Sequence, residues 1–257
     1  MKRFTPRKII FLLLALLSFA SAPLFAVDKT LQDEFTQANE AYFNRDFPKA
    51  IQLYSDLEKR GMVSGDLFYN LGNTYYRSGQ IGWAIYYYLK ALRYHPRDRD
   101  LVANYKYVLG KRVDQIETPL WIKVYRTLFF WVEGATLKEL LIVTLVLYWL
   151  FFLLLILRIL KKKFALTLAL LAVSAFNLAL LPTAVAKYYE EKVQVTGVVV
   201  SPVAPVFSEP AKGAIKLFEL HEGAVATVTD EANDFVKLRL PDGKRGWVGA
   251  GDVRQIR

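Results

Sequence analysis

Two long apolar runs without charge stand out in the second half of the chain. The first covers residues 137–157, with no charged residue from Leu140 onward, and the second covers 164–186. About 20 apolar residues in an α-helix are enough to cross the ~30 Å hydrocarbon core of a bilayer. Residues 158–163, between the two runs, carry one arginine and three consecutive lysines, and strongly basic loops stay in the cytoplasm. The pattern therefore predicts a transmembrane hairpin whose helices, 137–157 and 164–186, are joined by a cytoplasmic turn at 158–163.

The N-terminal segment, residues 1–26, has the pattern of a secretory signal peptide. Four basic residues precede an uncharged apolar run, and small residues follow up to Ala26. Cleavage after Ala26 and retention as an uncleaved anchor both remain open, and both place residue 30 onward outside the cytoplasm. Together with the basic turn, this predicts a bacterial inner-membrane protein in which residues 30–135 and 190–257 lie on the periplasmic side.

The segment before the first predicted span, residues 119–133, mixes aromatic rings with cations. Such a mixture suits the headgroup region of a bilayer, so we expect an interfacial helix here. The residues that carry the pattern are Trp121, Lys123, Tyr125, Arg126, Phe129, Phe130 and Trp131.

The second predicted span contains small residues and one amide. Its alanine pairs Ala165/Ala169 and Ala175/Ala179 have the small-xxx-small spacing that allows another helix to pack closely. Asn177 marks either a contact with a partner or, more simply, a hydrogen bond within the hairpin.

The most informative spacing along the chain lies in residues 65–98. Small residues recur where two antiparallel helices would cross, larger apolar residues flank them, and a proline follows the second helix. This spacing matches the 34-residue pattern of the tetratricopeptide repeat. The matching residues are Phe68, Leu71, Gly72, Tyr75, Ala84, Tyr88, Ala91 and Pro96.

A more degenerate copy of the pattern lies one period earlier. Ala38 precedes Gly72 by 34 residues, and Tyr54 precedes Tyr88 by the same interval. One period later, the pattern supplies only a first helix, which would cover the apolar face of the last repeat. The predicted elements are a first repeat at about 31–64, a second at 65–98 and a capping helix at about 101–113, together an all-α tetratricopeptide domain over 30–115.

Stacked tetratricopeptide repeats form a concave surface that takes up peptides or helices of partner proteins. Repeats that bind peptide termini use Asn with several Lys or Arg in this groove, and Asn39, Asn73 and Arg77 resemble part of that clamp. Phe35 and Asp100 stand where the clamp has bases, so the resemblance is incomplete. The alternative is that Asn39 and Asn73 hydrogen-bond to neighbouring backbone. The predicted partner-binding residues are Phe35, Asn39, Tyr42, Tyr69, Asn73, Tyr76 and Arg77.

From residue 193 onward, short β-rich runs replace the helical patterns. Glycine, proline, aspartate and asparagine separate the runs, and about 65 residues of this kind suit a small barrel. The stretch from Leu220 to Val248 resembles a bacterial Src-homology-3-type domain, and such domains bind cell-wall peptides or protein segments. Phe235 and Trp247 belong either to a ligand surface or to the core. The predicted strands are 193–200, 206–207, 214–220, 224–229, 235–240 and 246–248, within an all-β Src-homology-3-like barrel over 193–257.

Composition narrows the classes of function. Apolar residues make up 54% of the 257 residues, and the net charge is +10. The charge excess lies beside the apolar segments, since 28–118 has thirteen bases against twelve acids and 193–257 has eight of each, so we expect no nucleic-acid partner. With no cysteine, two histidines (His95 and His221) and no phosphate-binding glycine loop or nucleophile motif, we expect no catalytic, metal or cofactor site and no enzymatic activity.

The order of segments and several motifs resemble the BatE family of bacterial aerotolerance-operon proteins. The motifs are Phe68-Tyr-Asn-Leu-Gly-Asn-Thr-Tyr-Tyr, Ala84-Ile with Lys90-Ala-Leu, Pro96-Arg-Asp, the Trp-rich approach to the hairpin, and Gly246-Trp-Val. The resemblance implies a non-catalytic partner of membrane proteins with von Willebrand factor A domains and of a MoxR-type ATPase, with a role in oxidative-stress tolerance. We therefore expect a multidomain membrane protein that acts as a scaffold through its tetratricopeptide groove. The alternative is an envelope sensor that binds the cell wall, through peptidoglycan, with the C-terminal barrel.

Overall fold

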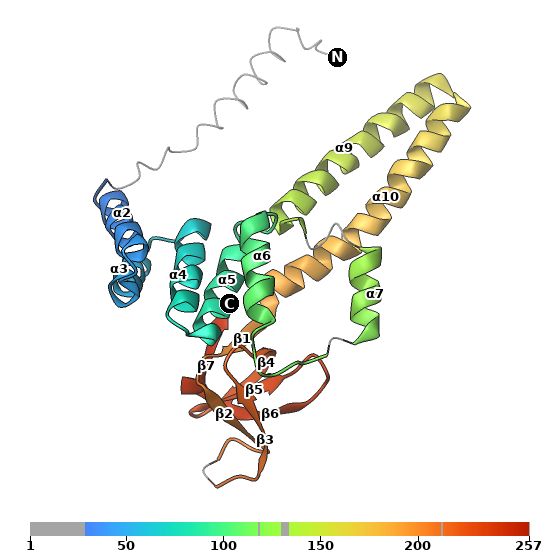
Figure 1. The fold of residues 1–257 in the computed structure, drawn as a ribbon. Helices are drawn as coiled ribbons and strands as arrows, with labels where there is room; N and C mark the ends of the chain where they lie inside the picture. The colour runs from blue at the N-terminus through green and yellow to red at the C-terminus, as the bar shows by residue number, and fades with distance from the viewer. Residues whose placement is uncertain (1–28, 118, 130–133, 212, 257) are drawn as a thin grey trace.

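Residues 29–117, 119–129, 134–211 and 213–256 are described by a computed structural model (Figure 1). The expected signal peptide and positions 130–133 of the predicted interfacial helix lie outside these residues. The described residues form a helical repeat domain, a long two-helix hairpin and a C-terminal β-sheet region, called the barrel below after its predicted fold.

The repeat domain is built from helix pairs, and polar side chains cap three of its helices. The capping residues are Asp46, Ser64 and Asp98. The side chain of each accepts a hydrogen bond from the backbone N–H three residues later, so an N–H group that the first turn of the helix leaves without a partner is satisfied. The last helix ends at Leu109, before Gly110, and not near 113 as the pattern predicted. The helices are α2 (Lys29–Phe43), α3 (Phe47–Lys59), α4 (Gly65–Arg77), α5 (Ile81–Leu92) and α6 (Arg99–Leu109).

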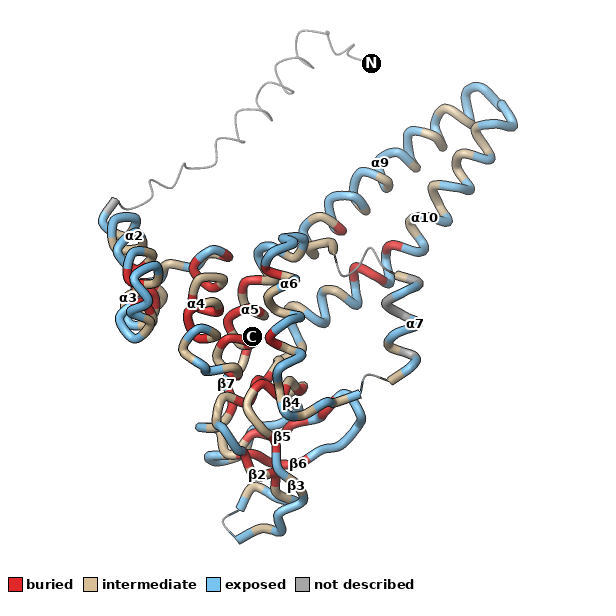
Figure 2. Tube along the Cα trace, in the orientation of Figure 1, coloured by how far each residue is buried: buried red, intermediate tan, exposed pale blue. Residues whose placement is uncertain are grey.

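The core of the repeat domain lies where α4 and α5 cross, and Figure 2 shows buried backbone concentrated there. Gly72 sits so close to Tyr88 that a Cβ at this position would lie 2.6 Å from the ring. Ala84 is fully buried on the opposing helix. Ala38 and Ala50 are fully buried at the corresponding positions of the first repeat, so the predicted 34-residue phase is present in the packing.

The hairpin consists of two helices that are long and apolar enough to cross a membrane. The first continues through Arg158 to Lys161, and only Lys162, in the left-handed region at φ +47°, and Lys163 separate it from the second. The predicted turn at 158–163 was therefore too long, because arginine and lysine are good helix formers that extend the last turn. The second helix also runs beyond the predicted end at 186 and passes through a π-helical turn into the barrel. The elements are α9 (Leu137–Lys161), α10 (Phe164–Tyr188) and the turn Tyr189–Val193.

Helix α10 packs on α9 through a face other than its alanine pairs. Leu180 and Ala184 are buried near the base of the hairpin, whereas Ala165, Ala175 and Ala179 are exposed. Most hairpin residues are exposed or half-buried, as Figure 2 shows, and many of the exposed ones are large and apolar. Ala169 is half-buried, so three of the four paired alanines of α10 remain exposed in the hairpin.

Polar side chains inside the two long helices bond to the backbone of their own helix. Asn177 Nδ2 donates to the Val173 carbonyl at 3.1 Å, which is the simpler of the two explanations for this amide. Thr144, Ser174 and Thr183 donate to backbone carbonyls in the same way. Such bonds satisfy donors that lipid could not.

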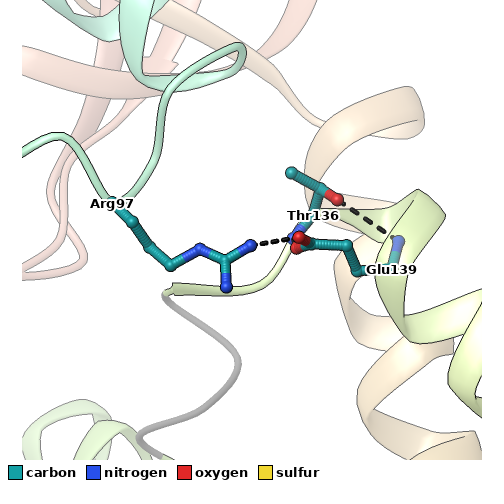
Figure 3. A network of polar contacts seen from close by, with 3 residues as sticks. All are labelled: Arg97, Thr136 and Glu139. Carbon is teal, nitrogen blue, oxygen red and sulfur yellow. Dashed lines mark hydrogen bonds and ion pairs between the residues drawn. The ribbon is translucent and has the colours of Figure 1, made fainter.

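The repeat domain also contacts the start of the hairpin (Figure 3). Thr136 caps α9 by accepting the Glu139 N–H at 3.2 Å, while the Glu139 carboxylate accepts the Thr136 N–H at 2.9 Å. The same carboxylate pairs with Arg97 from the loop after α5. Helix α7 (Leu120–Leu128) lies within the predicted interfacial segment and exposes Leu120 and Val124.

The C-terminal region forms a seven-stranded antiparallel sheet with the order β3-β2-β6-β5-β4-β1-β7. Its core contains Val199, Ala204, Val206, Leu238 and Val248. A final strand that the sequence pattern did not predict, β7, pairs with β1. The strands are β1 (Val195–Val199), β2 (Val203–Phe207), β3 (Lys216–His221), β4 (Val225–Ala232), β5 (Phe235–Arg239), β6 (Arg245–Gly249) and β7 (Val253–Ile256).

The barrel docks directly on α5 of the repeat domain through β1 and β7. At Gly82, in the first turn of α5, a Cβ would lie only 2.5 Å from the Val199 carbonyl oxygen, and the Gly82 N–H donates to Glu222 at 3.1 Å. Two barrel residues, Val198 and Ile256, are buried together with the core of the repeat domain.

The segment that follows α6 strengthens this docking. Asp114 accepts the backbone N–H of His221 at 2.6 Å, and its other oxygen lies 3.0 Å from the His221 Nδ1. The Arg254 guanidinium stands over the Trp83 ring at 5.0 Å. The barrel is therefore held on the second repeat at α5 and by the segment that follows α6.

Candidate partner-binding face

The asparagine of the first repeat belongs to an internal hydrogen-bond network. Asn39 Oδ1 accepts the Tyr54 hydroxyl at 2.6 Å and the Asn70 Nδ2 at 3.0 Å. Since Asn39, Tyr54 and Asn70 come from α2, α3 and α4, the network joins both helices of one repeat to the first helix of the next. This role requires the asparagine oxygen to point inward, away from a bound peptide.

The same network recurs one period later. Asn73 Oδ1 accepts the Tyr88 hydroxyl at 2.7 Å and the Asn104 Nδ2 at 3.2 Å, and Asn104 also donates to the Tyr69 hydroxyl at 2.8 Å. The partners of both asparagines are side chains, not the neighbouring backbone that the sequence alternative named. The two networks fix the spacing between α2, α4 and α6, whose side chains line the predicted groove.

Burial keeps the network tyrosines protonated. Burial raises the pKa of Tyr54 to about 12, and it also raises the pKa of Tyr88 and Tyr69. Each hydroxyl therefore remains a donor or a neutral acceptor at physiological pH, as its hydrogen bonds require.

A pocket of about 210 Å³ opens beside the first network. Phe43 forms an exposed lip, with 78% of its surface accessible, and its ring centroid lies 5.8 Å from that of Tyr42. Tyr42 in turn contacts Phe47 at 6.0 Å. The pocket is suited to an apolar side chain, and it is lined by Asn39, Tyr42, Phe43, Tyr54 and Asn70.

A second polar-aromatic cluster lies on α4 and α6. The Tyr76 and Tyr107 rings meet edge to face at 5.9 Å, and Lys111 Nζ lies 5.1 Å from the centre of Tyr107. The hydrogen bond between the two hydroxyls lowers the pKa of Tyr107 and raises that of Tyr76, and the Lys111 charge lowers the Tyr107 pKa further. Arg77 is exposed, with its guanidinium 5.9 Å from the Phe47 ring.

The structure separates the seven predicted residues into two kinds. Asn39, Asn73 and Tyr69 are engaged in the internal networks, and Phe35 packs edge to face against Tyr54 at 5.7 Å in the repeat core. Among the remaining predicted residues, Tyr42 and Tyr76 are half-buried, as the four engaged residues are, and Arg77 is exposed. Their partner-binding role stays a prediction.

Several residues of this face were missed from the sequence. Asn70 and Asn104 lie 34 residues apart, as Asn39 and Asn73 do, so the repeat phase alone could have identified them. Phe43 lies 34 residues before Arg77, and Tyr107 lies 34 residues after Asn73, so the same phase also marks these two positions, although the residue types differ.

The two histidines lie outside this face. His95 Nε2 is 3.6 Å from the Asp66 carboxylate, and His221 is bound by Asp114 at the barrel interface. Within the part of the chain that the structure describes, no three His, Cys, Asp or Glu side chains gather where they could hold a metal ion.

Two family models match parts of the chain. Residues 65–98 match the tetratricopeptide repeat, and residues 202–254 match the bacterial SH3 domain. The chain thus carries a tetratricopeptide repeat in its all-α region and a bacterial SH3 domain in its β-sheet region, as the sequence pattern predicted for both. The comparison with curated proteins found no match.

Among solved structures, the chain is similar to an NlpC/P60 family protein from Bacillus cereus ATCC 10987. The match has 18% identity and a TM-score of 0.22, and it covers 28% of this chain. It spans 23% of the Bacillus cereus chain, less than a quarter of that protein's length.

Proposed function

We propose that this chain is a non-catalytic scaffold of the bacterial envelope that holds protein partners on the inner face of its tetratricopeptide domain. The proposal is carried by one observation: after the asparagine networks are satisfied, aromatic and cationic side chains still line the groove side of α2, α4 and α6. These are Tyr42, Phe43, Tyr76, Arg77, Tyr107 and Lys111. Tyrosine and arginine are the residues that dominate protein interfaces.

The anchoring in the inner membrane is supported by α9 and α10. Both helices are apolar and exposed over most of their length. The repeat domain precedes the hairpin and the barrel follows it, yet the two contact each other directly at α5. Because two spans return the chain to the side of the membrane from which it entered, the repeat domain and the barrel lie on the same side, as their contact requires. The basic turn and the signal-peptide pattern both favour the periplasm as that side.

The partner class follows from the resemblance to the BatE family. It points to membrane proteins with von Willebrand factor A domains and to an envelope complex that acts in aerotolerance. The exposed alanines of α10 (Ala165, Ala175 and Ala179) offer a second contact for the spans of such partners, because small residues let helices approach closely in lipid.

The scaffold proposal is tested by site-specific photocrosslinking of the full chain in native membranes. A photoreactive residue at Tyr76 is expected to capture membrane proteins with von Willebrand factor A domains. The same residue at Lys59, exposed on α3, serves as the control and is expected to capture none. The double substitution Tyr76→Ala with Arg77→Ala should weaken partner retention by about tenfold to a hundredfold, because the loss of two contacts worth about 1 kcal/mol or slightly more each removes about 1.4 to 2.8 kcal/mol. Equal capture from both positions would refute binding at this face.

Cell-wall binding by the barrel is a second candidate, supported by the match to the bacterial SH3 domain. It is tested with the full chain, because Val198 and Ile256 of the barrel complete the core of the repeat domain. Co-sedimentation with purified peptidoglycan is the expected result for this candidate. Full recovery in the supernatant would remove it while leaving the scaffold proposal intact.

A further inference from the structure

A larger pocket, of about 360 Å³, lies at the junction between the repeat domain and the barrel. It shares no lining residue with the pocket beside Asn39. Its walls come from α3, α4, α5 and β7, so that it is complete only while the barrel is docked on α5. The lining residues are Glu58, Val63, Phe68, Tyr86, Lys90, Arg93, Tyr94, Gln255 and Ile256.

The charged groups of this junction pocket are arranged around Lys90. The Lys90 side chain is only 19% exposed and pairs with Glu58, which also accepts the Tyr87 hydroxyl at 2.9 Å. Among the described residues, Glu58 is the hydrogen-bond acceptor of Lys90, and an ammonium has three N–H groups. Two of these donors are thus available to a ligand, at a nitrogen that is largely shielded from water.

Aromatic rings surround the same nitrogen. Lys90 Nζ lies 3.9 Å from the centre of the Phe68 ring and 5.5 Å from that of Tyr86. Tyr94, whose ring centroid lies 5.8 Å from that of Phe68, is partly exposed at the mouth. Besides the pair formed by Lys90 and Glu58, the lining contains Arg93, which donates to the Ile256 carbonyl at 3.4 Å, and several apolar side chains.

We propose that the junction pocket binds the free carboxylate of a short apolar peptide. A shielded ammonium with spare donors forms strong, charge-assisted hydrogen bonds to a carboxylate. The rings of Phe68, Tyr86 and Tyr94 would then cover the apolar side chains of the residues that precede it, since aromatic walls with a few polar groups are typical of ligand sites. Such a carboxylate occurs both in cell-wall stem peptides and at protein C-termini, and binding at this junction does not depend on the groove residues of the scaffold proposal.

The test uses the full chain in detergent and isothermal titration calorimetry. The first probe is the tripeptide N-acetyl-Ala-Leu-Ala as the free acid, with its C-terminal amide as the matched control. The acid should bind about tenfold to a hundredfold more tightly than the amide, the range expected for one hydrogen-bonded charge. The soluble stem tetrapeptide of peptidoglycan is the second probe, and preferential binding of one probe identifies the source of the carboxylate. Failure of both probes to bind at millimolar concentration would overturn the proposal.

Substitutions at the pocket mouth separate recognition from folding. Val63 is 56% exposed, so neither Val63→Glu nor Val63→Lys should disturb the core. Val63→Glu should weaken binding of the acid, and Val63→Lys should strengthen it. The control is Val113→Glu, at an exposed position that is not part of the lining, and it should leave the affinity for the acid unchanged. Equal affinities of the two Val63 variants would refute recognition of charge. Lys90→Met should abolish the preference for acid over amide, and retention of that preference would likewise refute the assignment of Lys90.

Discussion

Substitution of Gly82 by alanine should separate the barrel from the repeat domain. The added Cβ would lie 2.5 Å from the Val199 carbonyl oxygen and 2.9 Å from Val200 Cα, against 3.4 Å or more for ordinary contact. Both atoms belong to the backbone of the barrel, and Val199 is fully buried, so neither can move aside without moving the barrel. The clash would also displace the Gly82 N–H from Glu222.

The size of this effect follows from three opposing contributions. Overpacking costs about 1 to 3 kcal/mol, and a lost hydrogen bond to a charged group costs about 1.5 to 3 kcal/mol. The better helix propensity of alanine returns at most about 1 kcal/mol, and less in a first turn. We therefore expect docking to weaken by about 1.5 to 6 kcal/mol, or roughly tenfold to 20,000-fold in the equilibrium between docked and separated domains.

Hydrogen exchange of the full chain in detergent measures this separation. Gly82→Ala should speed exchange at the start of α5 and at the Gly223 N–H, which donates to the Val199 carbonyl at 2.8 Å. Gly251→Ala is the matched control, because a Cβ at this exposed barrel glycine meets no atom within 4 Å. Unchanged exchange in Gly82→Ala, or equal changes in both variants, would refute the reasoning.

Three further predictions concern the repeat domain and its link to the hairpin. Asn73→Ala removes the acceptor of the Tyr88 hydroxyl and should lower the free energy of unfolding by about 1 to 3 kcal/mol, measured by urea titration; a loss below about 0.3 kcal/mol would contradict the network. The pKa of Tyr54 is raised in the folded state, so its contribution to the free energy of unfolding is intact below the unfolded pKa near 10 and is lost as pH rises toward about 12. Unfolding midpoints measured from pH 9 to 12 should therefore fall, and they should fall less in Tyr54→Phe. Arg97→Ala should change stability by less than about 0.5 kcal/mol in thermal unfolding, because Arg97 and Glu139 are 65% and 44% exposed; a larger loss would show that this ion pair holds the hairpin to the repeat domain.

Much of the repeat domain and the hairpin was predictable because the determining interactions are local. Gly72 and Tyr88 meet where the two helices of one repeat cross, and they lie only 16 positions apart in the sequence. The spacing of small and large residues therefore indicates this crossing directly. Apolar length alone identified α9 and α10, although the helix-forming Arg158 and Lys161 shortened the turn. The 34-residue phase predicted the packing of both repeats, since each repeat buries the same positions.

Which of the predicted residues are engaged inside the repeat domain was not predictable in the same way. Asn39 and Tyr76 are both half-buried, but Asn39 accepts hydrogen bonds from Tyr54 and Asn70, whereas the Tyr76 ring packs edge to face on Tyr107. Whether an asparagine oxygen points inward depends on how consecutive repeats stack, and that geometry is not recorded in the spacing of any single repeat.

The sequence by itself determined the class of each segment: helix pairs, an apolar hairpin and a strand-rich barrel, because periodicity and apolar length reflect local packing. Only the tertiary structure decided how they join. In the sequence, Gly82 looks like any glycine in the first turn of a helix. It is needed because the Val199 carbonyl approaches it closely, and Val199 follows the hairpin in the sequence whereas Gly82 precedes it. The docked barrel, the junction pocket and the final strand β7 all depend on such long-range contacts, which arise from shape and burial between distant segments.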